Sequence, residues 1–400
     1  MTRRSVVITG IGVVAPNGVG CAAFLTALQA GTSGIDEIRS FDTSDYPVHR
    51  GGEVRLVEPA ERVEGSQAGW TTTLSTIGVR EALKDAGLTP GSVDPARIGV
   101  LLGTTSGEVQ DEEELDGSWA RGRSDVFSDA AYAGFCSNSI PARLAQAFDF
   151  GGPALVLATA CASGNFAVAF GCDLIQHGQA DIIVAGGADG FSKVALAGFS
   201  RMHAVAPEKC QPFDRNRKGM MVAEGAGFVI LELEERARSR GANAYARVLG
   251  TGLGCDAFHL TAPNPDGMAH VMRLALADAG LAPEDVDYIS AHGTGTPVND
   301  AAETAAVKTA FGAAAYRTPV SSIKSMIGHT MGAASAIETV ACCLALRHGF
   351  LPPTINYSEP DPLCDLDCVP NTARFQRIEI AMNNSFAFGG NNASLVLGRA

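Results

Sequence analysis

Residues 158–164 read Ala-Thr-Ala-Cys-Ala-Ser-Gly, between an apolar run at 154–160 and a segment with helical spacing at 165–177. A strand that turns sharply into a helix is a nucleophile-elbow arrangement, which places Cys161 at the start of the helix. Unpaired N–H groups and the positive end of the helix dipole favour a thiolate there and stabilise a developing oxyanion. A buried structural cysteine at a strand end is the other interpretation, and this segment alone favours it.

Outward from this turn, short runs rich in Val and Ile alternate with helical segments, which is typical of layered α/β proteins. Strands are expected at 6–14, 98–103, 154–160, 181–186, 227–232, 246–252, 288–292, 320–322, 378–383 and 393–397. The helix at 165–177 is apolar on most sides, with Phe166, Phe170 and Leu174 among its residues, so we expect it to be buried.

The clearest helices cover residues 73–86 and 267–279. They end in similar stops, Asp-Ala-Gly-Leu-Thr-Pro at 85–90 and Asp-Ala-Gly-Leu-Ala-Pro at 278–283. Each stop precedes a charged turn and then an expected strand. The repetition hints at two similar halves.

The composition describes a globular, acidic protein. Its 400 residues are 46% hydrophobic and 18% charged, enough for a sizeable core, with a formal net charge of −13. That charge, without basic runs, argues against binding to nucleic acid or to an anionic membrane. The sequence has no uninterrupted apolar run of about 18 residues, so no membrane span is predicted.

The N-terminus and the cysteines favour a cytoplasmic protein. Arg3 and Arg4 precede an apolar run at 6–15, but its β-branched residues and glycines suit a buried strand better than a signal peptide. The ten cysteines are scattered and match no usual zinc or redox spacing. We therefore expect reduced thiols, most of them small core residues.

Two histidines lie in loops of small residues in the second half of the chain. His292 stands in Ala-His-Gly-Thr-Gly-Thr-Pro at 291–297, and His329 ends Lys-Ser-Met-Ile-Gly-His at 324–329. Both loops follow expected strands, and strand-end loops are where α/β proteins assemble their sites. A lone histidine is usually a surface or core group, but two such loops together with the Cys161 turn favour a reactive site.

Other motifs are not supported by their context. Gly10-x-Gly12-x-x-Ala15 resembles a dinucleotide fingerprint, but no helix follows at once and an acidic ribose partner is lacking, so no NAD site is predicted. Residues 328–332, Gly-His-Thr-Met-Gly, carry Thr where an acyltransferase has its serine. The eight histidines show no close paired spacing, so no metal site is predicted.

A series of motifs along essentially the whole chain resembles the β-ketoacyl-acyl-carrier-protein synthases, closest to the elongating KAS I/II branch and the ketosynthases of type II polyketide pathways. These are Val-Ile-Thr-Gly-Ile-Gly at 7–12, Phe-Asp-Thr-Ser at 41–44, the Cys161 turn, Ala-Gly-Gly-Ala at 185–188, Pro-Phe-Asp at 212–214, Glu-Gly-Ala-Gly at 224–227, both histidine loops and Asn-Ser-Phe-Ala-Phe-Gly-Gly at 384–390. Any one of them could arise by chance, but their joint order is highly specific.

The resemblance implies a thiolase fold, an α/β architecture of two duplicated βαβαβαββ halves packed in five αβαβα layers. It implies a single catalytic unit over residues 1–400. The N-terminal half, 1–245, would carry the nucleophile, and the C-terminal half, 246–400, both histidine loops. The family usually forms dimers, so we expect a homodimer or a heterodimer with a ketosynthase-like chain-length factor.

Carried over by motif, Cys161 is the nucleophile that accepts the acyl group, while His292 and His329 stabilise the enolate left when malonyl loses carbon dioxide. The implied reaction is a decarboxylative Claisen condensation of malonyl-carrier with this acyl group, giving a β-ketoacyl-carrier longer by two carbons. The substrates arrive on the phosphopantetheine arm of an acyl-carrier protein. No bound cofactor or metal is expected, since loss of carbon dioxide forms the carbanion.

Lys324, Glu303 and Glu338 match supporting positions of the family. Lys324 would act on the site electrostatically and orient His329, and the two glutamates match carboxylates behind the reacting residues. Plainer interpretations exist for each, because Lys324 could be a surface lysine and the glutamates ordinary helix residues.

Thr294 and Thr296 match hydroxyl groups that contact the phosphopantetheine arm. Phe388 falls at the aromatic gate of the acyl pocket, and its N–H with that of Cys161 would form an oxyanion hole. The alternatives are two loop threonines and a core phenylalanine beside the glycines at 389 and 390.

Two segments depart from the family pattern. Residues 63–70 replace a basic stretch that in relatives often contributes to docking of the acyl-carrier protein. An acidic carrier must then dock on other cations, and the candidates are Arg201, Lys209, Arg215, Arg217 and Lys218. Residues 106–128 replace a run that in relatives lines the dimer interface and the end of the acyl pocket. With Gly295, these departures favour specialised polyketide or polyene synthesis over fatty-acid elongation.

Three other functions fit these residues less well. A noncatalytic chain-length partner normally lacks the nucleophile, which Cys161 provides here. A thiolase would use a cysteine in the second half, and none stands at 386–390. A pure scaffold would need neither the cysteine nor the two histidine loops.

Overall fold

The computed structural model describes residues 4–55, 69–89, 91–123 and 136–400. The first half of the chain contains the order βαβαβαββ. Its elements are β1 (Val6–Ala15), α2 (Trp70–Asp85), β5 (Ile98–Gly103), α5 (Ser139–Phe148), β6 (Ala154–Leu157), α6 (Ser163–Gln176), β7 (Ile182–Asp189) and β8 (Gly225–Leu233). All five strands lie where the Val- and Ile-rich runs predicted them.

The second half repeats this order. Its elements are β9 (Ala246–Cys255), α9 (Pro265–Ala279), β10 (Tyr288–Ser290), α10 (Pro297–Phe311), β11 (Val320–Ser321), α12 (Ala334–His348), β14 (Ile380–Phe386) and β15 (Asn391–Arg399). The spatial order of strands is β6-β5-β7-β8-β1 in one half and β11-β10-β14-β15-β9 in the other. Equivalent strands occupy equivalent places and run in the same relative directions, so the predicted duplication is confirmed.

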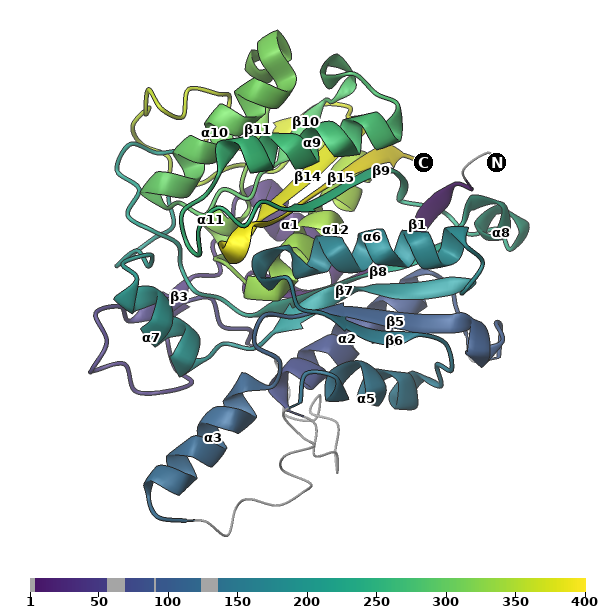
Figure 1. Cartoon of the computed structure of the whole chain (residues 1–400), viewed down its shortest axis with the longest axis horizontal. Helices are drawn as coiled ribbons and strands as arrows, with labels where there is room; N and C mark the ends of the chain where they lie inside the picture. The colour runs from purple at the N-terminus through teal and green to yellow at the C-terminus, as the bar shows by residue number, and fades with distance from the viewer. Residues whose placement is uncertain (1–3, 56–68, 90, 124–135) are drawn as a thin grey trace.

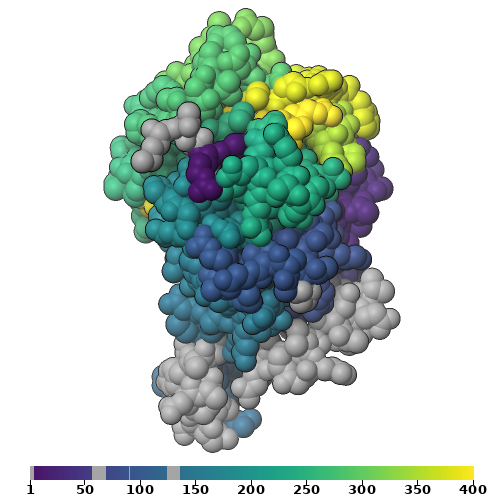
Figure 2. All heavy atoms as spheres, turned by 90° about the vertical axis from the view of Figure 1, so that its right-hand side faces the viewer, coloured from purple at the N-terminus to yellow at the C-terminus, as the bar shows by residue number. Residues whose placement is uncertain are grey.

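The two half-sheets meet where β1 pairs antiparallel with β9, and α6 and α12 pack against each other between them. Helices α2 and α5 cover the outer face of the first half-sheet, and α9, with α10 beside it, covers the outer face of the second. Figure 1 shows this stack of helices and strands, and Figure 2 shows the green and yellow second half at one end of the molecule. The layers αβαβα are those of the predicted thiolase fold.

The remaining elements are short or peripheral. The helices are α1 (Cys21–Ala30), α3 (Val109–Ala120), α7 (Lys193–Arg201), α8 (Glu234–Ser239) and α11 (Lys324–Ile327). Besides β11, the described two-residue strands are β2 (Gly18–Val19), β3 (Asp36–Glu37), β4 (Arg50–Gly51), β12 (Phe350–Leu351) and β13 (Arg374–Phe375). Helix α3, from the unusual segment 106–128, extends away from the body in Figure 1. Residues 63–68 and 124–128 of the departing segments lie outside the described residues.

Close packing of strand on helix explains the Gly10-x-Gly12 pattern. A Cβ atom at Gly12 of β1 would overlap the carbonyl oxygen of Gly78 in α2. In the second half, a Cβ atom at Gly252 of β9 would overlap the carbonyl oxygen of Val271 in α9. These glycines therefore let a helix approach the first strand of each half.

The repeated helix ends make repeated contacts. The Asp85 carboxylate accepts the Ile11 N–H at 3.0 Å, and the Asp278 carboxylate accepts the Thr251 N–H at 2.8 Å. Each bond ties the end of a helix to the first strand of its half. The Asp-Ala-Gly-Leu repetition thus marks the same junction twice.

The expectation that α6 is buried on most sides needs one correction. Val168 and Ile175 are buried, but Phe170 is 42% exposed, and Leu155 of β6 is 45% exposed. Leu155 lies on β6, the edge strand of the first half-sheet, and Phe170 lies on α6, which contacts β6. Across the part of the chain that the structure describes, no helix has the length and apolar character to cross a membrane.

Candidate active site

The Cys161 turn joins β6 to α6 through the 3-10 turn η3 (Ala160–Ala162). Ala160 has a φ of 49°, in the left-handed region, which turns the chain sharply before the helix. Cys161 is buried, and burial raises the pKa of its thiol to about 12, against the opposing charge of Lys324. Burial thus opposes the helix-end effect expected from the sequence and favours the neutral thiol.

The His292 loop follows β10 and is held by a carboxylate of α10. The Glu303 oxygens accept the N–H groups of His292 and Gly293 at 2.8 and 2.7 Å. Burial raises the pKa of Glu303 to about 7. Because both bonds go to the backbone, Glu303 fixes the loop and leaves the imidazole to face the site.

His329 follows α11, and its ring is held by the chain just beyond it. The Met331 N–H donates to His329 Nδ1 at 3.2 Å. A ring nitrogen that accepts a hydrogen bond carries no proton, so we assign the neutral ring its proton on Nε2. The His329 backbone is also fixed, since its N–H donates to the Met221 carbonyl oxygen at 2.7 Å.

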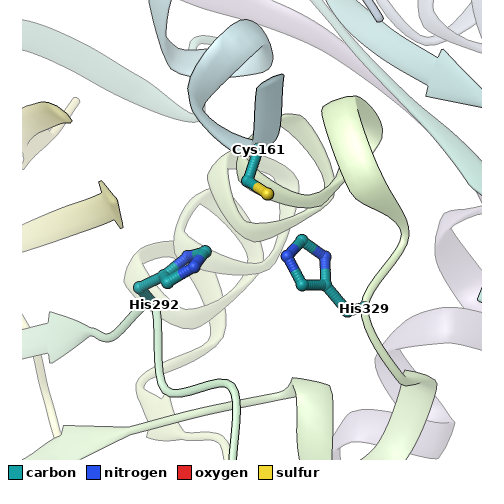
Figure 3. A group of neighbouring side chains, drawn as sticks. All are labelled: Cys161, His292 and His329. Carbon is teal, nitrogen blue, oxygen red and sulfur yellow. The ribbon is translucent and has the colours of Figure 1, made fainter. Parts of the chain in front are cut away.

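The structure brings Cys161, His292 and His329 together from three separate segments. The sulfur and one nitrogen of each ring all lie within 4.8 Å of one another, and Figure 3 shows the side chains converging. The two rings meet edge to face with centroids 5.5 Å apart. Burial first, and then the charge of Lys324, hold the pKa of both imidazoles well below 6.5, so both rings are neutral near pH 7.

Lys324 is fully buried and forms an ion pair with Glu338 of α12. Burial raises the pKa of Glu338 to about 7, while the Lys324 charge opposes this shift. A surface position for Lys324 is therefore excluded. In the described structure its hydrogen bond goes to Glu338, and the bond that orients the His329 ring comes from Met331.

A cavity of about 320 Å³ leads to the three residues. Thr294 and Thr296 line it, with their hydroxyl oxygens 2.9 Å apart. Phe388, in the turn η7 (Phe388–Gly390), also lines the cavity and is 38% exposed, with its ring 6.0 Å from that of Phe199. All three predicted cavity residues are thus beside the path to Cys161.

Arg217 must be removed from the candidates for a carrier-docking face. It is 7% exposed and forms an ion pair with Asp361. Its guanidinium also donates to the carbonyl oxygens of Thr296 at 3.3 Å and Pro297 at 3.0 Å. Arg217 therefore braces the Thr294–Thr296 loop from behind and is not available to a partner protein.

Asp189 is a buried residue of the site that the sequence analysis missed. Its carboxylate accepts the N–H groups of Thr105, Ser106 and Gly332 at 2.8, 2.9 and 2.6 Å, and also the Thr104 hydroxyl. Asp189 thereby ties the chain after β5 to the turn that holds His329. It stands directly after the quoted Ala-Gly-Gly-Ala motif, which was the signal available in the sequence.

Comparison with known families matches two family models in succession. The β-ketoacyl synthase N-terminal domain matches residues 3–237, and the β-ketoacyl synthase C-terminal domain matches residues 245–358. The tetracenomycin polyketide synthase ketoacyl synthase alpha subunit of Streptomyces glaucescens is 43% identical, with 100% of this chain and 99% of the relative covered. The 3-oxoacyl-[acyl-carrier-protein] synthase 2 of Coxiella burnetii is 40% identical, with 100% and 99% covered.

Solved structures give the same result. An ishigamide ketosynthase/chain length factor structure has a TM-score of 0.96 at 41% identity, with 100% of both chains covered. A type II polyketide synthase acyl-carrier protein in complex with its hexaketide-bound ketosynthase has a TM-score of 0.92 at 32% identity, again with 100% of both chains covered. The thiolase and chain-length-partner alternatives are not favoured by these matches. The chain belongs to the β-ketoacyl synthase family and is an acyltransferase of the kind that forms carbon–carbon bonds.

Proposed function

We propose that this ketosynthase condenses malonyl-carrier with an acyl group held on Cys161, using His292 and His329 to stabilise the enolate. The observation that carries the proposal is the convergence of one thiol and two neutral imidazoles, within 4.8 Å of one another, at a cavity lined by residues from both halves. A thiol supplies the nucleophile, and neutral rings supply N–H donors.

The first step transfers the acyl group. The Cys161 sulfur attacks the acyl thioester carbonyl, the carrier thiolate leaves, and the thiol proton passes to it, so an acyl-enzyme and a free carrier thiol result. The N-terminus of α6 stabilises the sulfur charge as it develops, which offsets the burial that favours the neutral thiol. The Phe388 N–H and the Cys161 N–H are proposed to bind the thioester oxyanion.

The second step breaks the carbon–carbon bond between the carboxylate and the α-carbon of malonyl-carrier and releases carbon dioxide. The electron pair moves into the thioester, and its oxygen becomes the enolate oxygen to which His292 and His329 donate. The enolate carbon then attacks the acyl group, the Cys161 thiolate leaves and takes up a proton from solvent, and the product is a β-ketoacyl-carrier longer by two carbons. Neutral rings suit this step, because each can donate an N–H.

We propose that the substrates arrive on a phosphopantetheine arm, which passes Thr294 and Thr296 on its way to Cys161. Glu303 fixes the His292 loop. The ion pair of Lys324 with Glu338 places a positive charge close to the two histidines. No cofactor bound by this chain is needed for the chemistry. Cysteine and histidine also bind Zn²⁺, so assays with and without EDTA would separate metal effects from condensation.

We further propose that the chain acts as one cytoplasmic catalytic unit over residues 1–400, with halves at 1–245 and 246–400. Its proposed partners are an acyl-carrier protein and a ketosynthase-like chain, either a second copy or a chain-length factor. The similar structures of a ketosynthase/chain length factor and of a ketosynthase with its carrier support these partners.

For the pathway, we propose specialised polyketide or polyene synthesis. The polyketide relative at 43% identity and the ishigamide structure at TM-score 0.96 support this choice, although the 3-oxoacyl synthase relative is 40% identical. Gly295 supports this choice only weakly, because its backbone conformation requires glycine whatever the pathway. Its φ is 77° and a Cβ there would lie 2.9 Å from the Gly219 carbonyl oxygen, so the backbone itself favours glycine.

The test is intact-mass analysis after incubation with acyl-carriers of varied length and unsaturation, followed by malonyl-carrier. We expect one acyl adduct that is lost in Cys161→Ala and retained in Cys136→Ser, a control at an exposed cysteine. Elongation restricted to unsaturated or ketide chains would support the specialised pathway, and elongation of saturated chains would contradict it. Absence of a Cys161 adduct with every donor would overturn the reaction itself.

A further inference from the structure

The main-chain carbonyl group of Cys161 is held by the second half of the chain. Its oxygen accepts the Ser335 hydroxyl at 3.3 Å and the Ser385 hydroxyl at 2.9 Å, from residues that lie 174 and 224 positions further along the sequence. Ser335 is in the first turn of α12, Ser385 is on β14, and both are fully buried. A carbonyl oxygen has two lone pairs, and these two hydroxyl groups satisfy both.

The Ser335 hydroxyl takes the place of a bond that a regular helix makes by itself. In an α-helix the Asn165 N–H would donate to the carbonyl four residues earlier, which is that of Cys161. Here the Asn165 N–H donates to Ser335 Oγ at 3.0 Å, and the Ser335 hydroxyl donates in turn to the Cys161 carbonyl. The other half of the molecule therefore sets the direction of this carbonyl.

This inserted hydroxyl requires α12 to approach α6 very closely. A Cβ atom at Gly164, in the first turn of α6, would lie 2.5 Å from the Ala336 nitrogen and 2.8 Å from Ser335 Oγ. Helix α12 can thus place Ser335 against the Cys161 turn because residue 164 has no side chain.

Two fully buried asparagines hold the serines from behind. The Asn383 amide nitrogen donates to Asn165 Oδ1 at 3.0 Å and to the Ser335 carbonyl oxygen at 2.9 Å. The Asn165 amide nitrogen donates to the Asn383 carbonyl oxygen at 3.2 Å. Asn383 and Ser385 are two residues apart on β14, so their side chains lie on the same face of the sheet. Helices α6 and α12 and strand β14 are therefore joined behind Cys161.

We propose that Ser335 and Ser385 are positioning residues for the nucleophile, which aim the Cys161 sulfur at the acyl thioester. The carbonyl belongs to the planar peptide group that follows the Cys161 Cα, so fixing its direction also restricts the direction of the Cα–Cβ bond. Figure 3 shows the side chain pointing between the two rings. Because Ser335 lies just beyond the turn that holds His329, its bond also maintains the spacing between thiol and imidazole. This inference rests on the proposed function, in which the sulfur attacks.

The experiment follows two reactions, acylation of Cys161 by acyl-carrier in a single turnover, read by intact mass, and release of carbon dioxide from malonyl-carrier without an acyl donor. The saturating rate of acylation should fall about tenfold in Ser385→Ala and about 100-fold in Ser335→Ala/Ser385→Ala, because the thiol is no longer held in line for attack. The carrier concentration at half of this rate should change by less than about twofold, and carbon dioxide release by less than about threefold, since neither depends on the direction of the thiol.

Ser394→Ala is the matched control, because it removes a hydroxyl from an equally buried serine on the neighbouring strand β15. The Ser394 hydroxyl donates at 2.7 Å to Asn384 Oδ1, and the Asn384 amide contacts α9 on the outer face of the sheet. This variant and Ser385→Ala should lower the midpoint of thermal unfolding to a similar extent, while Ser394→Ala leaves both reactions unaffected. Unchanged acylation in Ser385→Ala, or equal loss of acylation and carbon dioxide release, would overturn the positioning role. Failure of the wild type to form a Cys161 adduct would instead refute the proposed function.

Discussion

His329 offers one N–H to the site because Met331 occupies its other ring nitrogen. His329→Ala should therefore slow malonyl decarboxylation about 100-fold or more, the usual cost of losing an oxyanion donor. Acylation of Cys161 should fall much less, because it is not proposed to need this donor. His329→Gln should recover part of the rate, since its amide N–H extends in the direction of Nε2. Carbon dioxide release and intact mass report the two steps, and equal losses in both would contradict the assignment.

The pH profile of decarboxylation tests the neutral state of both histidines. Because burial and the Lys324 charge hold the pKa of both rings well below 6.5, the rate should stay level as the pH falls through 6.5. In Lys324→Met/Glu338→Gln the cation is removed and no buried carboxylate is left unpaired, so the pKa of both rings should rise. The acidic limb of the profile should then move to higher pH. A limb that does not move would show that Lys324 does not act through the histidines.

At the residue level, the sequence predicted the groups that stand in recognisable motifs. Cys161, His292 and His329 could be chosen by their turns and loops, and the structure brings them together. Asp189 could not be chosen by its residue type, because its importance lies in N–H groups supplied by residues 105, 106 and 332. The raised pKa of the Cys161 thiol could not be predicted from the sequence either, since it depends on burial more than on the local sequence.

At the scale of elements, equivalent substitutions at the strand–helix contacts of the two halves should destabilise the protein to a similar extent. Gly12→Ala and Gly252→Ala should each lower the free energy of unfolding by about 3 kcal/mol or more, because the new methyl group overlaps a helix carbonyl and the helix must shift. Gly198→Ala in α7 is the control. Nothing lies within 4 Å of its Cβ, and Ala should raise stability by up to about 1 kcal/mol. Chemical denaturation measures all three, and unchanged stability in Gly252→Ala would argue against equivalent packing.

The longer elements were predictable because their apolar patterns are long enough to be distinctive. The ten expected strands are all present, although β10 ends at Ser290, before His292. Of the six two-residue strands among the described residues, β11 was expected from the apolar run at 320–322, and the other five were not predicted. Pairing partners elsewhere in the chain define those five, and a two-residue pattern carries no periodicity. The exposed Phe170 was missed for a similar reason, since an apolar helix residue does not reveal whether its covering surface is part of the same chain.

At the scale of the whole molecule, the two outer edges of the sheet differ. At β11 the chain covers its own edge, because the Val320 N–H donates to the Asp367 carbonyl oxygen at 2.8 Å. At β6, Ala154 and Leu155 are exposed, and the described residues provide no strand beyond them. An open edge with apolar side chains favours pairing with another chain.

We therefore expect Leu155→Asp/Phe170→Glu to abolish dimer formation. Light scattering should give a mass near 41.4 kDa for the variant and about twice that for the wild type or its complex with a related chain. Leu363→Asp, at a comparably exposed leucine away from this edge, should remain a dimer. If Leu363→Asp were monomeric and Leu155→Asp/Phe170→Glu remained a dimer, the dimer interface would lie away from the β6 edge.

The turn before α6 has a counterpart before α12, and the pair limits how this scaffold can be re-engineered. In η6 (Met331–Ala333), Met331 has a φ of 51°, close to the 49° of Ala160 in η3. Gly332 thus occupies the place that Cys161 holds in the other half. A Cβ at Gly332 would lie 2.6 Å from the Thr105 nitrogen, so the scaffold does not accept a second thiol by simple substitution. Designers who seek two loaded acyl chains per subunit would first have to rebuild the chain after β5.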